Sequence, residues 1–316
     1  MIRSEANFKG VDLIVSYKPS YFLLTLDCIA KINNLYLMRF GFHISIAGGF
    51  KTVVAKAKEK NCETIQLFSR NPRGWQFSSL DKKDIEQFKH DIKTSGISPV
   101  FVHMPYLPNL ASGEKVLFRK SVESLMVDLE RCEILSIPYL IMHVGRRMAI
   151  TEDKAIKNVA TGINQAFKKV GNRLKLLLEN TAGMGSEIGY NFSQLQAIIQ
   201  LIENKNRIGV VLDTAHTFEA GYNLATKNGL DETLKEFDKL VGLKRLHLLH
   251  LNDSKTDFGS HVDRHWHIGE GKIGEEGFRN IVNHPLLRHL PGIMETPRTN
   301  DEEDLKNMKT IRSLTI

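Results

Sequence analysis

Short apolar runs alternate with longer segments of helical period from residue 38 to the C-terminus. The apolar runs predict β-strands at residues 38–45, 64–69, 99–104, 139–144, 174–180, 208–214, 244–252 and 291–296. The remaining periodic segments predict α-helices near residues 50–60, 79–94, 114–136, 153–169, 191–204, 230–241, 275–283 and 300–314. Because strands that alternate with helices form parallel sheets, the eight pairs predict an α/β fold, the parallel eight-stranded (β/α)8 or TIM barrel. A doubly wound open sheet is the alternative, but it would not bring the ends of six consecutive strands to one point.

The chain of 316 residues is long enough for one such barrel, since these barrels use roughly 200 to 400 residues. We expect residues 38–316 to form a single catalytic domain and residues 1–37 to be an N-terminal extension of unknown role. The apolar stretch Tyr21–Leu26 is interrupted by Asp27 and Lys31, well short of the ~20 residues that span a membrane. Residues 1–37 contain three acidic residues, Glu5, Asp12 and Asp27, so they also match the acid-poor composition of a transit peptide poorly.

The chain carries a formal charge of +7, which favours an anionic partner such as nucleic acid, although a solvated basic surface is the simpler alternative. Its three cysteines, Cys28, Cys62 and Cys132, are odd in number and lack a CxxC spacing. Neither a disulfide framework nor a cysteine zinc site is therefore indicated, and we expect a reducing compartment.

Side chains that are able to bind metal lie at the ends of six of the apolar runs or in the loops that follow them. They are His103, His143, Glu179, Asp213, His216, His250, Asp263, His265 and Glu295. Because the active sites of these barrels lie at the C-terminal ends of the strands, the nine side chains are expected to converge there. Five imidazoles with four carboxylates suit zinc or manganese, and they exceed what one ion needs.

Single members of this set have simpler interpretations. Glu179 follows three leucines, where a buried carboxylate is costly unless it is paired or bound to metal, so a structural salt bridge is the alternative. Glu295 repeats the pattern on the last strand. His143 and His250 would each pass for core histidines with satisfied hydrogen bonds. The occurrence of all nine side chains at the ends of successive strands argues against these alternatives.

Two short motifs complete the set. Asp213 and His216 are spaced i and i+3, which also suits a helix N-cap followed by a surface histidine. Asp263 and His265 are spaced i and i+2 in the polar segment 254–271, where an extended chain points both the same way. A solvated loop is the alternative, but loops of this length in compact domains are usually functional or disordered.

Two further residues are expected to lie beside the ligands and to orient them. His43 ends the first predicted strand, and Asn252 lies two residues after His250. His247 is three residues before His250 on the same strand, so alternation sends it to the opposite face.

From about Phe40 to the C-terminus, four motifs resemble the endonuclease IV family of apurinic/apyrimidinic (AP) endonucleases. They are Glu179-Asn180-Thr181-Ala182-Gly183, Asp213-Thr214-Ala215-His216, His250-Leu251-Asn252-Asp253, and Phe258-Gly259-Ser260 continuing through Asp263-Arg264-His265 to Gly269-Glu270-Gly271. The resemblance implies a trinuclear Zn²⁺ site, with Mn²⁺ as a substitute. Its three groups are His103, His143 and Glu179; the bridging and catalytic Glu179 with Asp213, His250 and Glu295; and His216, Asp263 and His265.

The resemblance also implies contacts with DNA. Arg73 and Tyr106 correspond to side chains that the family inserts into the minor groove, and we assign Pro72 and Arg264 to the same DNA-binding set. The chain departs from the family pattern twice: Pro72 stands where Gln is usual, and Val144 stands where Pro is usual.

The implied activity is hydrolysis of the phosphodiester 5′ to an abasic site in base excision repair, giving 3′-hydroxyl and 5′-deoxyribose phosphate ends, together with cleaning of blocked 3′ ends. The implied partner is double-stranded DNA with abasic or 3′-blocked lesions. We expect an intracellular monomer without membrane or obligate protein partners, in the cytoplasm or in a nuclear or other DNA-containing compartment. A xylose-isomerase-like sugar isomerase or epimerase and a non-catalytic DNA-lesion binder are the alternatives. The isomerase would leave five of the nine donors without a role.

Overall fold

Eight parallel strands form a closed barrel in the computed structural model, which describes residues 37–316. The barrel strands are β1 (Phe40–Ile44), β2 (Thr64–Phe68), β3 (Val100–His103), β4 (Tyr139–His143), β5 (Lys175–Glu179), β6 (Ile208–Asp213), β7 (Leu246–His250) and β10 (Gly292–Met294). Their order around the barrel is β1-β10-β7-β6-β5-β4-β3-β2. The predicted TIM barrel is thus confirmed, and the open sheet is wrong.

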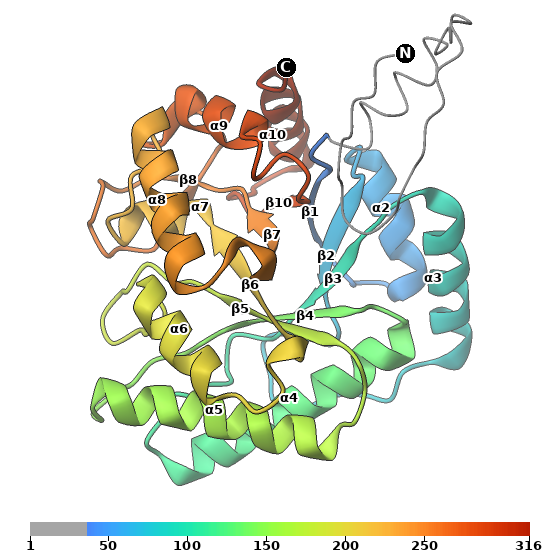
Figure 1. The fold of residues 1–316 in the computed structure, drawn as a ribbon. Helices are drawn as coiled ribbons and strands as arrows, with labels where there is room; N and C mark the ends of the chain where they lie inside the picture. Colours follow the sequence, from blue (N-terminus) through green and yellow to red (C-terminus); the bar gives the residue numbers. More distant parts are fainter. Residues whose placement is uncertain (1–36) are drawn as a thin grey trace, which may run out of the picture. The chain divides into compact units, whose positions relative to one another are not determined.

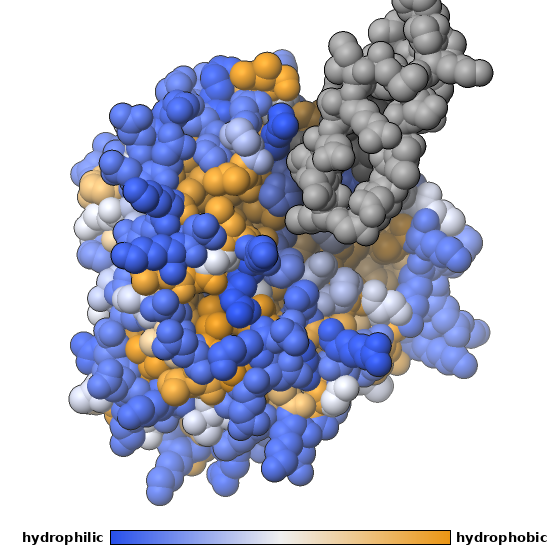
Figure 2. All heavy atoms as spheres, in the orientation of Figure 1, coloured by the Kyte–Doolittle hydropathy of each residue, from blue (hydrophilic) through white to orange (hydrophobic). Residues whose placement is uncertain are grey.

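Helices surround this sheet (Figure 1). They are α2 (Val53–Glu59), α3 (Lys82–Ser95), α4 (Lys115–Leu135), α5 (Glu152–Lys169), α6 (Phe192–Leu201), α7 (Thr214–Glu219), α8 (Lys227–Leu240), α9 (Gly274–Asn283) and α10 (Asp301–Ser313). Hydrophilic residues cover much of the face seen in Figure 2, with apolar residues showing between them. Within the described part of the chain, no helix combines the length and the apolar character that a bilayer span requires.

The barrel interior is closed by six fully buried side chains, one from each of six strands: Phe101, Ile141, Leu177, Val211, Leu248 and Ile293. Their neighbours along each strand, such as Leu176 and Leu178, belong instead to the larger core beneath the helices. Side chains alternate between the two faces of a strand, so the residue two positions later points inward again. Those next inward positions are His103, His143, Glu179, Asp213, His250 and Glu295. Strand periodicity therefore places six predicted ligands in one layer above the apolar interior.

Two local elements were not expected from the sequence. The short helix α7 follows β6 directly and carries His216. The segment 254–271 contains a two-stranded antiparallel ribbon, β8 (Asp253–Ser254) with β9 (His265–Trp266). The interpretation of residues 1–37 as an extension lies outside the described residues, except for Leu37.

Candidate metal centre

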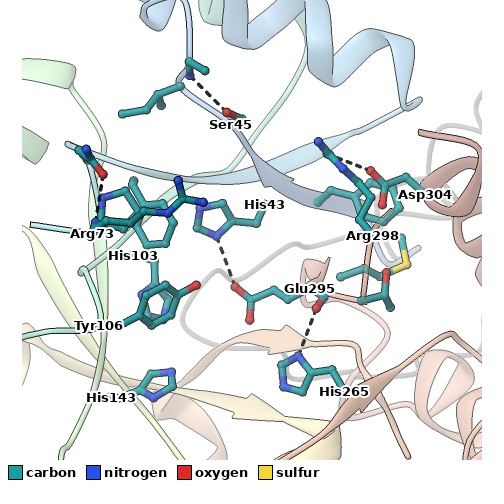
Figure 3. Close-up of a pocket in the computed structure, with 18 of the residues that line it drawn as sticks. His43, Ser45, Arg73, His103, Tyr106, His143, His265, Glu295, Arg298 and Asp304 are labelled. Atoms are coloured by element: carbon teal, nitrogen blue, oxygen red, sulfur yellow. Dashed lines mark hydrogen bonds and ion pairs between the residues drawn. The ribbon is translucent and has the colours of Figure 1, made fainter. Parts of the chain in front are cut away.

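All nine predicted ligands lie together at the C-terminal end of the barrel. Donor atoms within 4.8 Å of one another form three groups: His103, His143 and Glu179; Glu179, Asp213, His250 and Glu295; and Asp213, His216 and His265. Asp263 lies beside the third group, its Oδ1 3.5 Å from His216 Nε2 and 3.8 Å from His265 Nε2. Figure 3 shows several of these side chains turned toward a common cleft.

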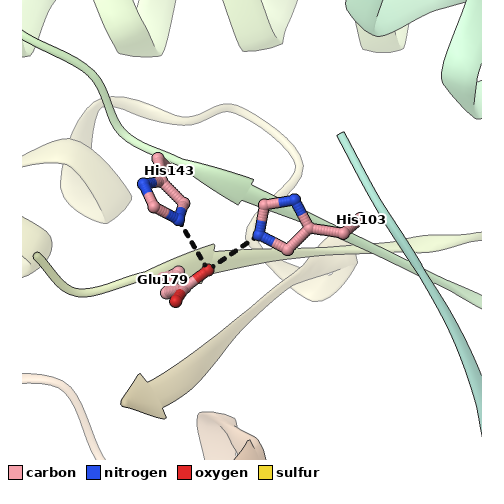
Figure 4. Close-up of side chains that lie close together, drawn as sticks. All are labelled: His103, His143 and Glu179. Carbon is pink, nitrogen blue, oxygen red and sulfur yellow. Dashed lines mark hydrogen bonds and ion pairs between the residues drawn. The ribbon is translucent and has the colours of Figure 1, made fainter. Parts of the chain in front are cut away.

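Glu179 connects the first two groups. The Nε2 atoms of His103 and His143 lie 2.9 and 3.2 Å from its Oε2 (Figure 4). Its other oxygen, Oε1, lies 2.9 Å from His250 Nδ1. Burial opposes ionisation of this fully buried carboxyl, but the imidazoles, led by His250, hold its pKa well below the usual range. One carboxylate thus faces three imidazoles from three strands.

His250 faces a ring of carboxylates. Its Nδ1 lies 3.2 Å from Glu295 Oε2 and 3.8 Å from Asp213 Oδ2, in addition to Glu179. Burial lowers the pKa of His250, but the surrounding carboxylates outweigh burial and raise it to about 9. This buried cluster of carboxylates requires positive charge close to the imidazole.

Three of the five histidines are oriented as metal ligands are. Nδ1 of His103 donates to Met104 O, Nδ1 of His216 to Asn180 O, and Nε2 of His250 to Gln66 Oε1, at 2.6, 2.9 and 2.8 Å. In the neutral tautomer that each bond selects, the second nitrogen keeps a lone pair directed into the centre. Metal-bound histidines almost always use their outer nitrogen in this way.

The third group brings two imidazole nitrogens face to face. His265 Nδ1 lies 3.2 Å from Glu295 O and therefore donates to it, so the lone pair of His265 Nε2 faces the lone pair of His216 Nε2 at 3.3 Å. Two such lone pairs repel unless a proton or a cation lies between them. The mixed nitrogen and oxygen donors suit zinc or manganese better than calcium or magnesium.

The two residues that were expected to orient the ligands lie against them. Asn252 donates from Nδ2 to Asp213 Oδ2 at 2.7 Å, and its Oδ1 accepts from the backbone N–H of Glu295 at 2.7 Å. His43 lies with its Nδ1 3.4 Å from Glu295 Oε1, and burial lowers its pKa. Its Nε2 has no hydrogen-bond partner among residues 37–316.

Gln66 is a residue of the centre that sequence reasoning missed. Its amide donates to Glu295 Oε1 at 2.6 Å and to His43 Nδ1 at 2.9 Å, and its oxygen accepts from His250. Ile65 and Leu67 pack beneath the helices, so Gln66 is inward-facing on β2. The sequence signal for this position was a polar residue, Gln66, between two apolar residues of a predicted strand.

The proposed DNA-contacting residues lie partly around the same cleft. A cleft of about 790 Å³ is lined by Pro72, Arg73 and Tyr106 together with ligands of all three groups. Tyr106 is 69% exposed at its rim. Arg264 does not line this cleft, and its guanidinium donates to Asp263 O at 2.6 Å. Arg298, which sequence reasoning did not select, also lines it and pairs with Asp304 at 3.3 Å (Figure 3).

Comparisons with known proteins agree with this fold and show the family. Residues 54–314 match the family described as "Xylose isomerase-like TIM barrel". The "Probable endonuclease 4" of Methanosphaerula palustris is 44% identical over 283 residues, covering 89% of this chain and 99% of that protein. The crystal structure of endonuclease IV from Thermus thermophilus is 36% identical with a TM-score of 0.78, covering 87% of this chain and 98% of that one. A D-tagatose 3-epimerase-like protein is 17% identical, with a TM-score of 0.65 over 88% of this chain and 97% of that one, and shares the fold alone.

Proposed function

The chain belongs to the endonuclease IV family, and we propose that it hydrolyses DNA on the 5′ side of abasic sites during base excision repair. The products would carry 3′-hydroxyl and 5′-deoxyribose phosphate ends. The observation that carries the proposal is the convergence of nine nitrogen and oxygen donors in three contiguous groups at the open end of the barrel. We assign the activity to residues 38–316.

We propose that three Zn²⁺ ions, or Mn²⁺ in their place, are held by these groups. His103, His143 and Glu179 would hold one ion, Glu179, Asp213, His250 and Glu295 a second, and His216, Asp263 and His265 a third. When bound, such ions activate water near neutral pH and stabilise the oxygens that attack and leave in an in-line displacement.

Glu179 contributes by holding two of these groups together. Its two oxygens face opposite sets of imidazoles, with His103 and His143 on one and His250 on the other. The carboxylate is fully buried and ends β5, so its position follows from the barrel itself. A glutamine here would keep the shape and lose the charge that both groups share.

The cleft rim accounts for lesion selection. Arg73 and Tyr106 stand at the cleft above the ligands, where side chains can enter the minor groove beside a nucleotide that has left the helix. Removing a nucleotide from the stack costs about a few kcal/mol and least where no base pairs or stacks, which favours abasic sites. The charge of +7 supports sequence-independent attraction to the phosphates.

The same centre would act on blocked 3′ ends as a phosphodiesterase or phosphatase, because the bond that breaks is again a phosphoester of the 3′ oxygen. We place this activity inside the cell in a reducing compartment and expect a monomer. Within the described residues, Cys62 and Cys132 are buried free thiols, which supports a reducing environment.

An incision assay tests the proposal. The substrate is a 5′-labelled duplex with one tetrahydrofuran abasic analogue, which cannot undergo β-elimination, and the matched control is the intact duplex. We expect metal-dependent cleavage of the first alone, with a 3′ end that a polymerase extends. Tight lesion binding without cleavage by metal-loaded protein would favour a non-catalytic binder.

A sugar isomerase or epimerase remains the second candidate because of the shared fold. Such a centre would use Glu179, Asp213, His250 and Glu295, and it would give the group of His216, Asp263 and His265 no role. Turnover of ketoses by the metal-loaded protein, in the absence of incision, would establish that function instead.

A further inference from the structure

Glu219, the last residue of α7, is fully buried beside the metal centre. It is not one of the nine predicted ligands. Its Oε1 accepts a hydrogen bond from the backbone N–H of Arg264 at 3.2 Å. The hydroxyls of Ser254 and Thr256 lie 2.7 and 3.1 Å from the same oxygen. One carboxylate oxygen thus faces one donor at the end of β8 and two donors in the loop that follows it.

That loop carries two of the predicted ligands. Residues 255–264 connect β8 to β9, so Asp263 ends the loop and His265 begins β9. Arg264, whose N–H bonds Glu219, lies between these two ligands. Two backbone bonds add to the contact, from His261 N to Glu219 O at 3.0 Å and from Gly259 N to Phe218 O at 3.1 Å.

The helix that receives these bonds also carries His216. Helix α7 begins directly after Asp213, and the carboxylate of Asp213 caps it by accepting from His216 N at 2.9 Å. Glu219 therefore links the element that positions His216 to the loop that positions Asp263 and His265. The segment beyond the ribbon is fixed separately, because the carboxylate of Asp253 accepts backbone bonds from residues 269, 271, 273 and 274.

We propose that Glu219 is a positioning residue that sets the metal affinity of the group formed by His216, Asp263 and His265. The inference rests on the metal centre of the proposed function, but not on the reaction that the centre performs. Removing the Glu219 carboxylate leaves the loop attached to α7 by the backbone bonds of residues 259 and 261, and the Arg264 carbonyl still accepts from Lys255 N. It frees the N–H of Arg264, which lies between the two ligands.

Burial of the Glu219 carboxyl costs folding stability, which indicates that the residue serves to position the loop. Burial raises the pKa of its carboxyl, although the bonds from Ser254 and Arg264 oppose the rise. Its Oε2 has no hydrogen-bond partner within residues 37–316. A buried carboxyl with one unpartnered oxygen destabilises a fold relative to an apolar side chain. Local violations of this kind are expected where a protein holds a functional group in place.

Metal release from the full-length protein tests the inference. Wild type, Glu219→Ala and Glu219→Gln are loaded with zinc, dialysed at fixed pH against graded concentrations of a chelator, and analysed for metal per chain. Glutamine keeps an oxygen that accepts all three bonds, so Glu219→Gln should release metal as wild type does. Glu219→Ala should lose one equivalent at a free zinc concentration about 10 to 100 times higher, the usual effect of removing a group that orients a ligand.

Glu187→Ala is the matched control. Glu187 is also a nearly buried glutamate that pins a loop, accepting from Arg146 at 2.9 Å and from Met184 N at 3.0 Å, but it touches none of the nine ligands. It should release metal as wild type does. Ser254→Ala removes only one of the three donors and should give a smaller shift of the same equivalent, which provides a second measurement if Glu219→Ala folds poorly.

Three outcomes overturn the proposal: wild-type release by Glu219→Ala and Ser254→Ala, equal loss of every equivalent in Glu219→Ala, and equal weakening by Glu219→Gln and Glu219→Ala. Selective loss in Glu219→Ala with rescue by glutamine supports it. Because metal content is measured, a protein that failed to incise DNA would refute the proposed function while leaving this result intact.

Discussion

Replacing Gln66 by leucine should weaken metal binding while preserving the barrel. Gln66 is fully buried and connects three side chains of the centre, those of His250, His43 and Glu295. Leucine has a similar size but cannot accept the N–H of His250 Nε2. The imidazole would then bury an unpartnered donor, or it would move its proton to Nδ1 and lose the lone pair that faces Glu179.

The expected size of the effect follows from that single bond. A buried donor without its partner costs about 1 to 3 kcal/mol, and about 1.4 kcal/mol corresponds to one decade in an equilibrium constant. Removing the outer partner of a metal-binding histidine commonly lowers affinity by about 10 to 100-fold, which agrees with that range. We expect Gln66→Leu to lower metal affinity by one to two decades and to lose incision at limiting zinc but not in excess.

Competition with a chromophoric chelator at fixed pH measures this affinity. Gln194→Leu is the matched control, because Gln194 is equally buried and bonded to Gly189 N and Glu152 at 2.6 and 2.8 Å, away from the ligands. It should lower thermal stability and leave metal affinity unchanged. Unchanged affinity in Gln66→Leu, or an equal loss in both variants, would refute the reasoning.

Four further predictions follow from the centre. Purified, unchelated protein should contain more than one equivalent of zinc or manganese by elemental analysis, and stripping the metal should abolish incision; absence of transition metal would contradict the trinuclear site. Since the pKa of His250 is raised to about 9 without metal, a cation must displace its proton below that pH, so metal affinity should fall as pH is lowered from 9 to 6, and a flat profile by calorimetry would contradict this. Glu179→Gln should keep the fold by circular dichroism and reduce turnover severely, whereas wild-type turnover with full metal content would show that Glu179 does not bridge. Arg73→Ala with Tyr106→Ala should lower the preference for abasic over intact duplex by about one to three decades at fixed salt, on the scale of a few kcal/mol for filling an unstacked gap, and equal weakening of both DNAs would assign these residues to backbone contacts.

Sequence periodicity predicted the eight strands and the layer of six ligands because both depend on the alternation of side chains along a strand. It did not reveal Glu219, whose partners lie 35 to 45 residues away and whose helix is too short for a periodic signal. The ribbon of β8 and β9 was missed for a related reason, since two residues per strand show no alternation. The sequence assigned Asp213 to the second group alone, but the structure places it in the third group as well. This position depends on how α7 packs against the loop, which a sequence pattern does not reveal.

The six apolar side chains inside the barrel support the centre from below. Each of these six strands supplies one inward side chain to the apolar layer and its next inward side chain to the metal site. A cavity in the apolar layer, such as Leu177→Ala would leave under Glu179, would disturb the spacing of the metal ligands as well as the stability of the fold. A single packed interior can in this way support different reactions above it, which fits the sharing of this barrel with an epimerase-like protein of only 17% identity.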